Sequence, residues 1–302
     1  IKNPINEIKV LIKNKKIDEN ITFNQNSKVL FNMVKYDVLK KQIENKVKSN
    51  KYISFKNFKK KSDLLSLPQK KNPDLVINCE GSNILTEKYL RTKVFKNYNN
   101  KAFTTIISHS KIENNQAIQI FTEFGPLAFL PLSKTLTSVV FSFDMKKKDI
   151  SEIEIYKIIE NLNPKYKITS HLKFENFNLK LKLPKKYYFG NILFFGDSIH
   201  AIHPLAGQGF NMTLRDIKNL LEIITNRIQL GLPLDQSVCI EFQKKVKSNN
   251  LIFSEGINFI YESFNFKNKI KGDFIDRSVK LIGKNKLINK YLKKIADEGL
   301  QI

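Results

Sequence analysis

The residues whose types and spacing could do chemistry gather in one short stretch, residues 196–216. Asp197 directly follows the apolar run 191–195, and a loop containing Gly207 and Gly209 comes after it. Apolar residues at helical spacing follow the loop, so the free N–H groups and the positive dipole end of a helix start point back into it. Such an arrangement favours an anionic group. The stretch therefore predicts a ligand site between a strand and a helix.

The elements that must position this stretch are a strand before it and a helix after it. Residues 191–195 (NILFF) are typical of a buried strand, and Gly196 ends it. Apolar residues recur at helical spacing through 214–228, and Gly231, with a proline two residues later, predicts the C-terminus of the helix. We expect this helix to begin near residues 209–211.

Each of these residues also has a simpler interpretation when taken alone. His200 and His203 could be metal ligands, but no cysteine or further histidine falls at ligand spacing, so we expect no metal site and favour a structural role in the loop. Asp197 could cap a helix, and Gly207 and Gly209 could mark an ordinary turn. Only their order within the longer stretch favours a binding site.

The stretch 196–216, GDSIHAIHPLAGQGFNMTLRD, resembles the second FAD fingerprint of the aromatic-hydroxylase flavoproteins, whose fold is that of p-hydroxybenzoate hydroxylase. Within this group it is most similar to the ubiquinone-biosynthesis hydroxylase family. The matching positions are Gly196, Asp197, His200, His203, Pro204, Ala206, Gly207, Gln208, Gly209, Asn211 and Asp216. Two positions depart from the pattern: Ile199 replaces a small residue, and Thr213 replaces a glycine.

The resemblance implies where FAD would bind. Asp197 would accept hydrogen bonds from the ribityl chain, the loop and helix start would line the flavin ring and its phosphates, and the helix start would stabilise negative charge on the reduced flavin. The implied cofactor-binding residues are Gly196, Asp197, Pro204, Ala206, Gly207, Gln208, Gly209, Phe210 and Asn211. No side chain is assigned as a catalytic acid or base.

Two further segments resemble the same family. Residues 121–132 (FTEFGPLAFLPL) are similar to a segment on the sheet that faces the flavin ring, with Ile120 where an arginine often stands. Residues 74–81 (DLVINCEG) are similar to a strand and turn that these hydroxylases use near the cofactor, with Glu80-Gly81 in place of Asp-Gly. The resemblance also implies NAD(P)H as the reductant.

The sequence contains no GxGxxG motif. The family opens with that loop, inside a βαβ unit of about 30 residues or more that binds the ADP half of FAD. Residues 6–13 and 21–34 already resemble strands that follow this unit. We therefore expect the sequence to be N-terminally truncated. We also expect the 302-residue chain to be inactive by itself and not to retain FAD.

The order of the patterns predicts a mixed α/β (α+β) fold. It comprises an FAD-binding Rossmann-like domain that lacks its first βαβ unit, an interleaved and mainly antiparallel β-sheet substrate domain, and C-terminal helices. We assign residues 1–35 and 93–188 to the substrate domain. Residues 36–92 and 189–302 are assigned to the FAD-binding domain.

Individual elements follow from the period of the apolar residues. Beyond residues 1–35, which read as strands, we predict strands at 75–77, 102–107, 118–122, 127–132 and 137–143. We predict helices at 36–47, 152–162 and from 235 to the end of the chain.

Size and composition are typical of a globular enzyme. The chain has 302 residues and 41% hydrophobic residues, enough for a core and two domains. No apolar run approaches the roughly 18 residues that span a bilayer. Cys79 and Cys239 are two isolated thiols, which indicate a reduced compartment, and we expect a cytoplasmic location.

The net charge of +24 bears on possible partners. Only four of the 52 basic residues are arginines, and readers of bases and phosphates rely on bidentate arginine, so we expect no specific nucleic-acid partner. We expect most of the lysines to be spread over solvated faces. The alternative is that the excess supports peripheral contact with the inner face of an anionic membrane, where each lysine near the surface contributes about 1 kcal/mol. Contact with a ubiquinone-biosynthesis complex is the other partner we expect.

The resemblance implies an FAD-dependent monooxygenase that hydroxylates the aromatic ring of a hydrophobic polyprenyl phenol on the way to ubiquinone. Its oxygen would come from O₂ through a flavin hydroperoxide. Two alternatives stay open. One is another FAD oxidoreductase of the same fold, such as a polyprenyl reductase or a halogenase, although the tryptophan common in halogenase motifs is absent. The other is a non-enzymatic basic remnant, which would not bind flavin.

Overall fold

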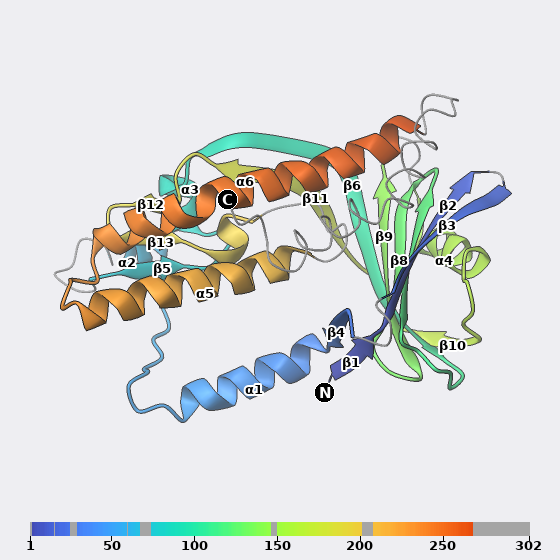
Figure 1. Ribbon diagram of the computed structural model, residues 1–302, viewed down its shortest axis with the longest axis horizontal. Coiled ribbons are helices and arrows are strands. Elements are labelled where there is room, and N and C mark those ends of the chain that lie inside the picture. The colour runs from blue at the N-terminus through green and yellow to red at the C-terminus, as the bar shows by residue number, and fades with distance from the viewer. Residues whose placement is uncertain are drawn as a thin grey trace. The chain divides into compact units, whose positions relative to one another are not determined.

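The computed structural model describes residues 2–14, 16–24, 29–58, 60–66, 74–145, 150–200 and 208–267. The chain divides into two compact units (Figure 1). Unit 1 comprises residues 1–56 and 99–178, and unit 2 comprises residues 57–98 and 179–302.

The two units are interleaved along the sequence, as the predicted fold class requires. The limits of the units differ from the predicted domains: residues 36–56 fall in unit 1, whereas the sequence pattern assigned 36–92 to the FAD-binding domain. The domain assignment itself stays a prediction.

An eight-stranded sheet is built mainly from unit 1, in the order β10-β6-β9-β8-β7-β2-β3, with β11 beside β6. Its strands are β2 Glu7–Asn14, β3 Lys16–Asn24, β6 Thr92–His109, β7 Gln116–Thr122, β8 Gly125–Pro131, β9 Leu136–Asp144, β10 Ile168–His171 and β11 Glu175–Pro184. The pairs β7–β8, β8–β9 and β6–β9 are antiparallel, whereas β2 lies parallel to β7. A separate antiparallel pair joins β1 Lys2–Ile5 to β4 Phe31–Val34.

Alternating side chains on the central strands form the core of unit 1. Phe129 of β8 and Phe141 and Phe143 of β9 are completely buried. Helix α4 Glu152–Asn161 covers this face with its buried Ile155 and Ile159. Period-2 burial on strands and period-3.6 burial on the helix are what the sequence pattern predicts. The predicted strands 118–122, 127–132 and 137–143 and the helix 152–162 are therefore confirmed to within a few residues at their ends. The predicted strand 102–107 lies within β6, which begins ten residues earlier, at Thr92.

Helix α1 Tyr36–Lys48 is confirmed where residues 36–47 predicted it. None of its residues is buried, and Ile43 is 54% exposed.

Unit 2 contains a three-stranded sheet of β12 Tyr188–Phe189, β13 Ile192–Phe194 and β5 Val76–Asn78. Strands β13 and β5 are parallel, with Ile192 opposite Val76, whereas β12 and β13 are antiparallel. Short helices α2 Lys61–Leu65 and α3 Ile84–Tyr89 flank β5 in sequence. The predicted strand at 75–77 begins and ends one residue later.

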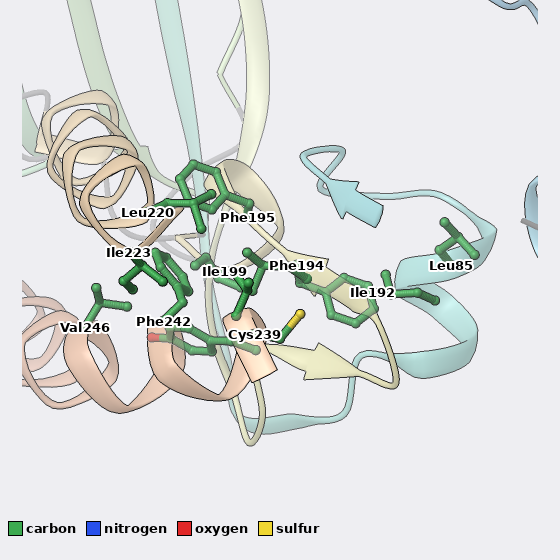
Figure 2. Packing of buried hydrophobic residues seen from close by; sticks show 13 residues of the cluster. Leu85, Ile192, Phe194, Phe195, Ile199, Leu220, Ile223, Cys239, Phe242 and Val246 are labelled. Carbon is green, nitrogen blue, oxygen red and sulfur yellow. The ribbon is translucent and has the colours of Figure 1, made fainter. Parts of the chain in front are cut away.

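Two long helices, α5 Gln208–Gln229 and α6 Gln236–Lys267, pack on each other and form the core of unit 2 with β13. Figure 2 shows Leu220 and Ile223 of α5 beside Phe242 and Val246 of α6, next to Phe195 at the end of β13. No helix in the described part of the chain is long and apolar enough to cross a membrane.

Both ends of α5 agree with the sequence pattern. The helix begins at Gln208, one residue from the expected start, and ends before Gly231, which has a φ of +64°. The N–H of Leu232 donates to the carbonyl of Arg227 at 2.9 Å, and that of Gly231 donates to Ile228 at 3.1 Å. This is the glycine-terminated motif that satisfies the last carbonyls of a helix. Beyond α6, the predicted helical stretch lies outside the described residues.

Candidate cofactor site

The carboxyl ends of the parallel strands β5 and β13 meet at one edge of the unit 2 sheet. The N–H of Phe195, directly after β13, donates to the carbonyl of Asn78 at the end of β5 at 2.9 Å. The Ser198 hydroxyl donates to the same carbonyl at 3.2 Å. In open α/β sheets, ligands bind outside the carboxyl ends of the strands. Two segments more than a hundred residues apart are therefore joined where a ligand site is expected.

The turn after β13 is a short 3₁₀ helix, η1 Gly196–Ser198, and glycines let it pack closely. Gly196 has a φ of +59°, a left-handed conformation that favours glycine. A Cβ on Gly81, in the turn after β5, would lie 3.2 Å from the carbonyl oxygen of Asp197. Any larger residue at Gly81 would require the turn at Asp197 to shift by a few tenths of an ångström. The Glu80-Gly81 turn and the turn at Asp197 therefore lie close enough to form one surface.

Hydrogen bonds within the β5–α3 connection hold that surface. The Asn83 side chain caps α3 by accepting the N–H of Thr86 at 2.9 Å, and it donates to the Asn78 side chain at 2.7 Å. The Asn78 amide in turn donates to the Thr86 hydroxyl at 2.9 Å, and that hydroxyl donates to the carbonyl of Glu80 at 3.0 Å. The backbone beside Asp197 is thus fixed by buried or half-buried polar groups.

Asp197 is the charged group that this surface presents. Its side chain is exposed, and its carboxylate makes no hydrogen bond to another side chain in the described part of the chain. The charge of Asp197 also acts on Cys79. Burial of the thiol raises the pKa of Cys79, and the negative charge of Asp197 raises that pKa further. Among the described residues, Asp197 is therefore an available hydrogen-bond acceptor at the strand ends.

The start of α5 supplies the second half of the site. Gly209 is half-buried, Phe210 is 58% exposed and Asn211 is exposed. A Cβ added to Gly209 would meet no atom within 4 Å, so there is open space beside the first turn. The N–H groups at the start of this 22-residue helix carry a partial positive charge. An acceptor at Asp197 and donors at α5 suit a ligand that has hydroxyls and negative charge, as FAD does.

The structure covers only some of the predicted cofactor residues. Gly196, Asp197, Gly209, Phe210 and Asn211 are described, and so is the backbone of Gln208. The predicted residues Pro204, Ala206 and Gly207 lie outside the described residues. The assignment of these nine residues to FAD stays a prediction.

The pairing of His200 with Asp216 was not predicted from the sequence. Nε2 of His200 lies 2.6 Å from Oδ2 of Asp216, and both side chains are almost completely buried. In the described part of the chain, no group of His, Cys, Asp and Glu could hold a metal ion. Their positions in the sequence could have suggested this contact, because His200 comes directly before the loop and Asp216 lies on the helix that follows it.

In unit 1, residues 121–132 form the end of β7, a tight turn and β8. The Thr122 hydroxyl donates to the carbonyl of Gly125 at 2.7 Å and accepts from the N–H of Phe124. Ile120 is 4% exposed and packs in the core of unit 1, where a charged arginine would be costly. The isoleucine that replaces the arginine is therefore an apolar side chain in an apolar environment.

A family described as "FAD binding domain" matches residues 69–229, more than half of the chain and the part that contains β5, β13 and α5. The chain belongs to this family. The family implies FAD as the cofactor. The exposed acceptor at Asp197 and the N–H groups at the start of α5 fit this cofactor.

Curated relatives narrow the resemblance. Ubiquinone biosynthesis monooxygenase COQ6 of Dictyostelium discoideum is 24% identical over 251 residues, covering 66% of this chain and 51% of the relative. 3-Demethoxyubiquinol 3-hydroxylase of Escherichia coli is 27% identical, covering 48% of this chain and 39% of the relative. Ubiquinone hydroxylase UbiL of Rhodospirillum rubrum is 25% identical over 51% of this chain and 38% of its own. The resemblance to ubiquinone-biosynthesis hydroxylases is confirmed, and the chain spans about half the length of these relatives or less.

Solved structures confirm the fold class. PqsL of Pseudomonas aeruginosa, a probable FAD-dependent monooxygenase, superposes with a TM-score of 0.66 at 14% identity, covering 87% of this chain and 79% of that one. CmlS, a flavin-dependent halogenase, superposes with a TM-score of 0.63 at 14% identity, covering 96% of this chain and 59% of that one. At such identities the likeness extends to the fold alone.

Proposed function

We propose that the protein is an FAD-dependent monooxygenase that hydroxylates the aromatic ring of a polyprenyl phenol in ubiquinone biosynthesis. The observation that carries the proposal is the exposed Asp197 carboxylate at the joined ends of β5 and β13, in a chain that belongs to an FAD-binding family. Its similarity to proteins named ubiquinone biosynthesis monooxygenase and ubiquinone hydroxylase supports the choice of substrate class.

Bound FAD would supply the activation of O₂, through a flavin hydroperoxide, with NAD(P)H as the reductant. The residues of this chain would bind and orient the cofactor. Asp197 would accept hydrogen bonds from ribityl hydroxyls, and the N–H groups at the start of α5 would stabilise negative charge on the reduced flavin ring. Gly81 and Gly196 would allow the two turns to approach each other closely enough to form one binding surface.

The partners in this proposal are O₂ and a hydrophobic aromatic substrate. A polyprenyl tail partitions into membranes, and the net charge of +24 favours contact with an anionic membrane surface. We therefore propose a cytoplasmic protein that acts peripherally at the inner face of a membrane, alone or within a ubiquinone-biosynthesis complex.

The test is oxygen transfer by the complete gene product. The protein is supplied with FAD, NADH or NADPH, a short-chain polyprenyl phenol and ¹⁸O₂, and the product is analysed by mass spectrometry. We expect one ¹⁸O atom in the ring. Reduction of the prenyl chain, or chlorination of the ring when chloride is present, would replace this proposal with a reductase or a halogenase. A protein that binds no FAD would support the non-enzymatic alternative.

A further inference from the structure

A buried polar cluster lies directly behind the candidate cofactor turn. Nε2 of His200 is 2.6 Å from Oδ2 of Asp216, and the two side chains are 1% and 2% exposed. The Asn250 amide donates to both carboxylate oxygens of Asp216, at 3.3 Å and 3.1 Å. A buried carboxylate is tolerated only when such partners compensate its lost hydration. His200 and Asn250 therefore compensate the burial of the Asp216 carboxylate.

The cluster connects three elements of unit 2. His200 ends the turn that carries Asp197, and its own N–H donates to the carbonyl of Gly196 at 3.0 Å. Asp216 lies about two turns into α5, and Asn250 lies on α6. His200 and Asp216 also stand on either side of residues 201–207. The hydrogen bond between them thus joins the two halves of the candidate site, the turn at Asp197 and the start of α5.

The geometry favours a positioning role over a chemical one. An ionised carboxylate only accepts hydrogen bonds, so with Asp216 in that form Nε2 of His200 is the donor of the bond between them. The ring is 1% exposed, and its Nδ1 has no hydrogen-bond partner in the described part of the chain. A group so enclosed is poorly placed to exchange protons with a substrate, whereas its one short bond fixes the distance between two backbone segments.

We propose that His200 and Asp216 are positioning residues, which hold the turn at Asp197 in register with the N-terminus of α5 so that both reach one ligand. The proposal rests on the FAD site proposed above. It assigns no chemical step to His200. It predicts that the donor at the position of Nε2 matters, and that the imidazole ring as such does not.

Two substitutions separate these roles. In His200→Gln the side-chain nitrogen is the same number of bonds from Cα as Nε2, so the hydrogen bond to Asp216 can be kept. In His200→Asn it is one bond closer, at the position of Nδ1, and the bond is lost. Hydrogen exchange is measured by mass spectrometry on the complete gene product without FAD. We expect at least tenfold faster exchange in peptides covering 196–200 and 208–216 in His200→Asn, and exchange within about threefold of the parent in His200→Gln.

FAD titration supplies the second readout. We expect His200→Asn to bind FAD at least tenfold more weakly and His200→Gln to bind nearly as the parent does. Val246→Ala is the matched control, because Val246 is a buried core residue of α6 outside the cluster. It should lower the unfolding temperature without weakening FAD binding.

Three outcomes would overturn the inference. Equal exchange in His200→Asn and the parent would mean that the bond does not hold the turn. Equal loss of FAD binding in both His200 variants would mean that the ring itself acts. Equal loss in Val246→Ala and His200→Asn would reduce the effect to general stability. If the parent binds no FAD, the proposed function fails, and the exchange experiment still decides whether the pair holds the turn.

Discussion

Removal of the Asp197 carboxylate is the most direct test of the candidate site. Asp197 is exposed and makes no side-chain hydrogen bond within the described residues, so Asp197→Ala should leave the fold intact. The contact of its backbone oxygen with Gly81 does not depend on the side chain. Hydrogen bonds to a charged group contribute about 1.5–3 kcal/mol. Since about 1.4 kcal/mol is tenfold in affinity, FAD should bind about one to two orders of magnitude more weakly.

The assay is a fluorescence titration of FAD into the complete gene product, with folding checked by circular dichroism. Lys60→Ala is the control, because Lys60 is an exposed charged residue distant in sequence from the strand ends, and it should bind FAD as the parent does. Equal affinity of the Asp197 variant and the parent would refute the reasoning. The cofactor would then lie elsewhere, and every assignment that depends on the turn after β13 would have to be withdrawn.

Three further predictions concern the same chain. Burial raises the pKa of Cys79, and the charge of Asp197 raises it further, so Asp197→Asn should lower that pKa and speed alkylation of Cys79 by iodoacetamide at pH 8. Buried Cys239 is the unreactive internal reference, and an unchanged rate at Cys79 would contradict the proximity of Asp197 and Cys79. Gly125→Ala places a Cβ 2.0 Å from a backbone oxygen of β9 at a φ of +140°, so chemical denaturation should show a free energy of unfolding lower by at least about 3 kcal/mol. The control is Gly190→Ala, where φ is +56° and the space is open, and it should lower the free energy of unfolding by about 1 kcal/mol. Burial raises the pKa of Cys239 from 9.0 to about 12, so its neutral thiol stabilises the fold fully below pH 9 and progressively less as the pH rises towards 12. Cys239→Ala should flatten this part of the stability–pH profile. An unaltered slope would refute the raised pKa of Cys239.

Local patterns predicted the elements that depend on local interactions. The alternation of apolar residues in β8 and β9 matches their alternating burial, with Phe129 and Phe141 inside. Gly231 correctly marked the end of α5, because a glycine at positive φ completes the hydrogen bonds of the last turn. These signals are contained in a few consecutive residues, so they can be recognised without knowledge of the fold.

Contacts between distant segments could not be predicted in this way. The parallel pairing of β2 with β7 joins residues more than a hundred positions apart, and nothing in either strand specifies the other. The bond between His200 and Asp216 depends on how the turn meets α5, which helical periodicity does not determine. Likewise, α1 was correctly predicted as a helix with an apolar side, yet none of its residues is buried, because burial depends on what packs against the helix.

The two departures from the family pattern, Ile199 and Thr213, lie where they affect packing and not the acceptor of the candidate site. Ile199 is 1% exposed and packs in the core of unit 2, beneath the turn. Thr213 lies on α5, where its methyl carbon would be 3.6 Å from a Cβ on Gly196, and its hydroxyl bonds the carbonyl of Gly209 at 3.3 Å. Both larger side chains therefore act on the packing between the turn and α5. The Asp197 carboxylate remains exposed, so the departures alter the support of the proposed ligand surface and leave its acceptor in place.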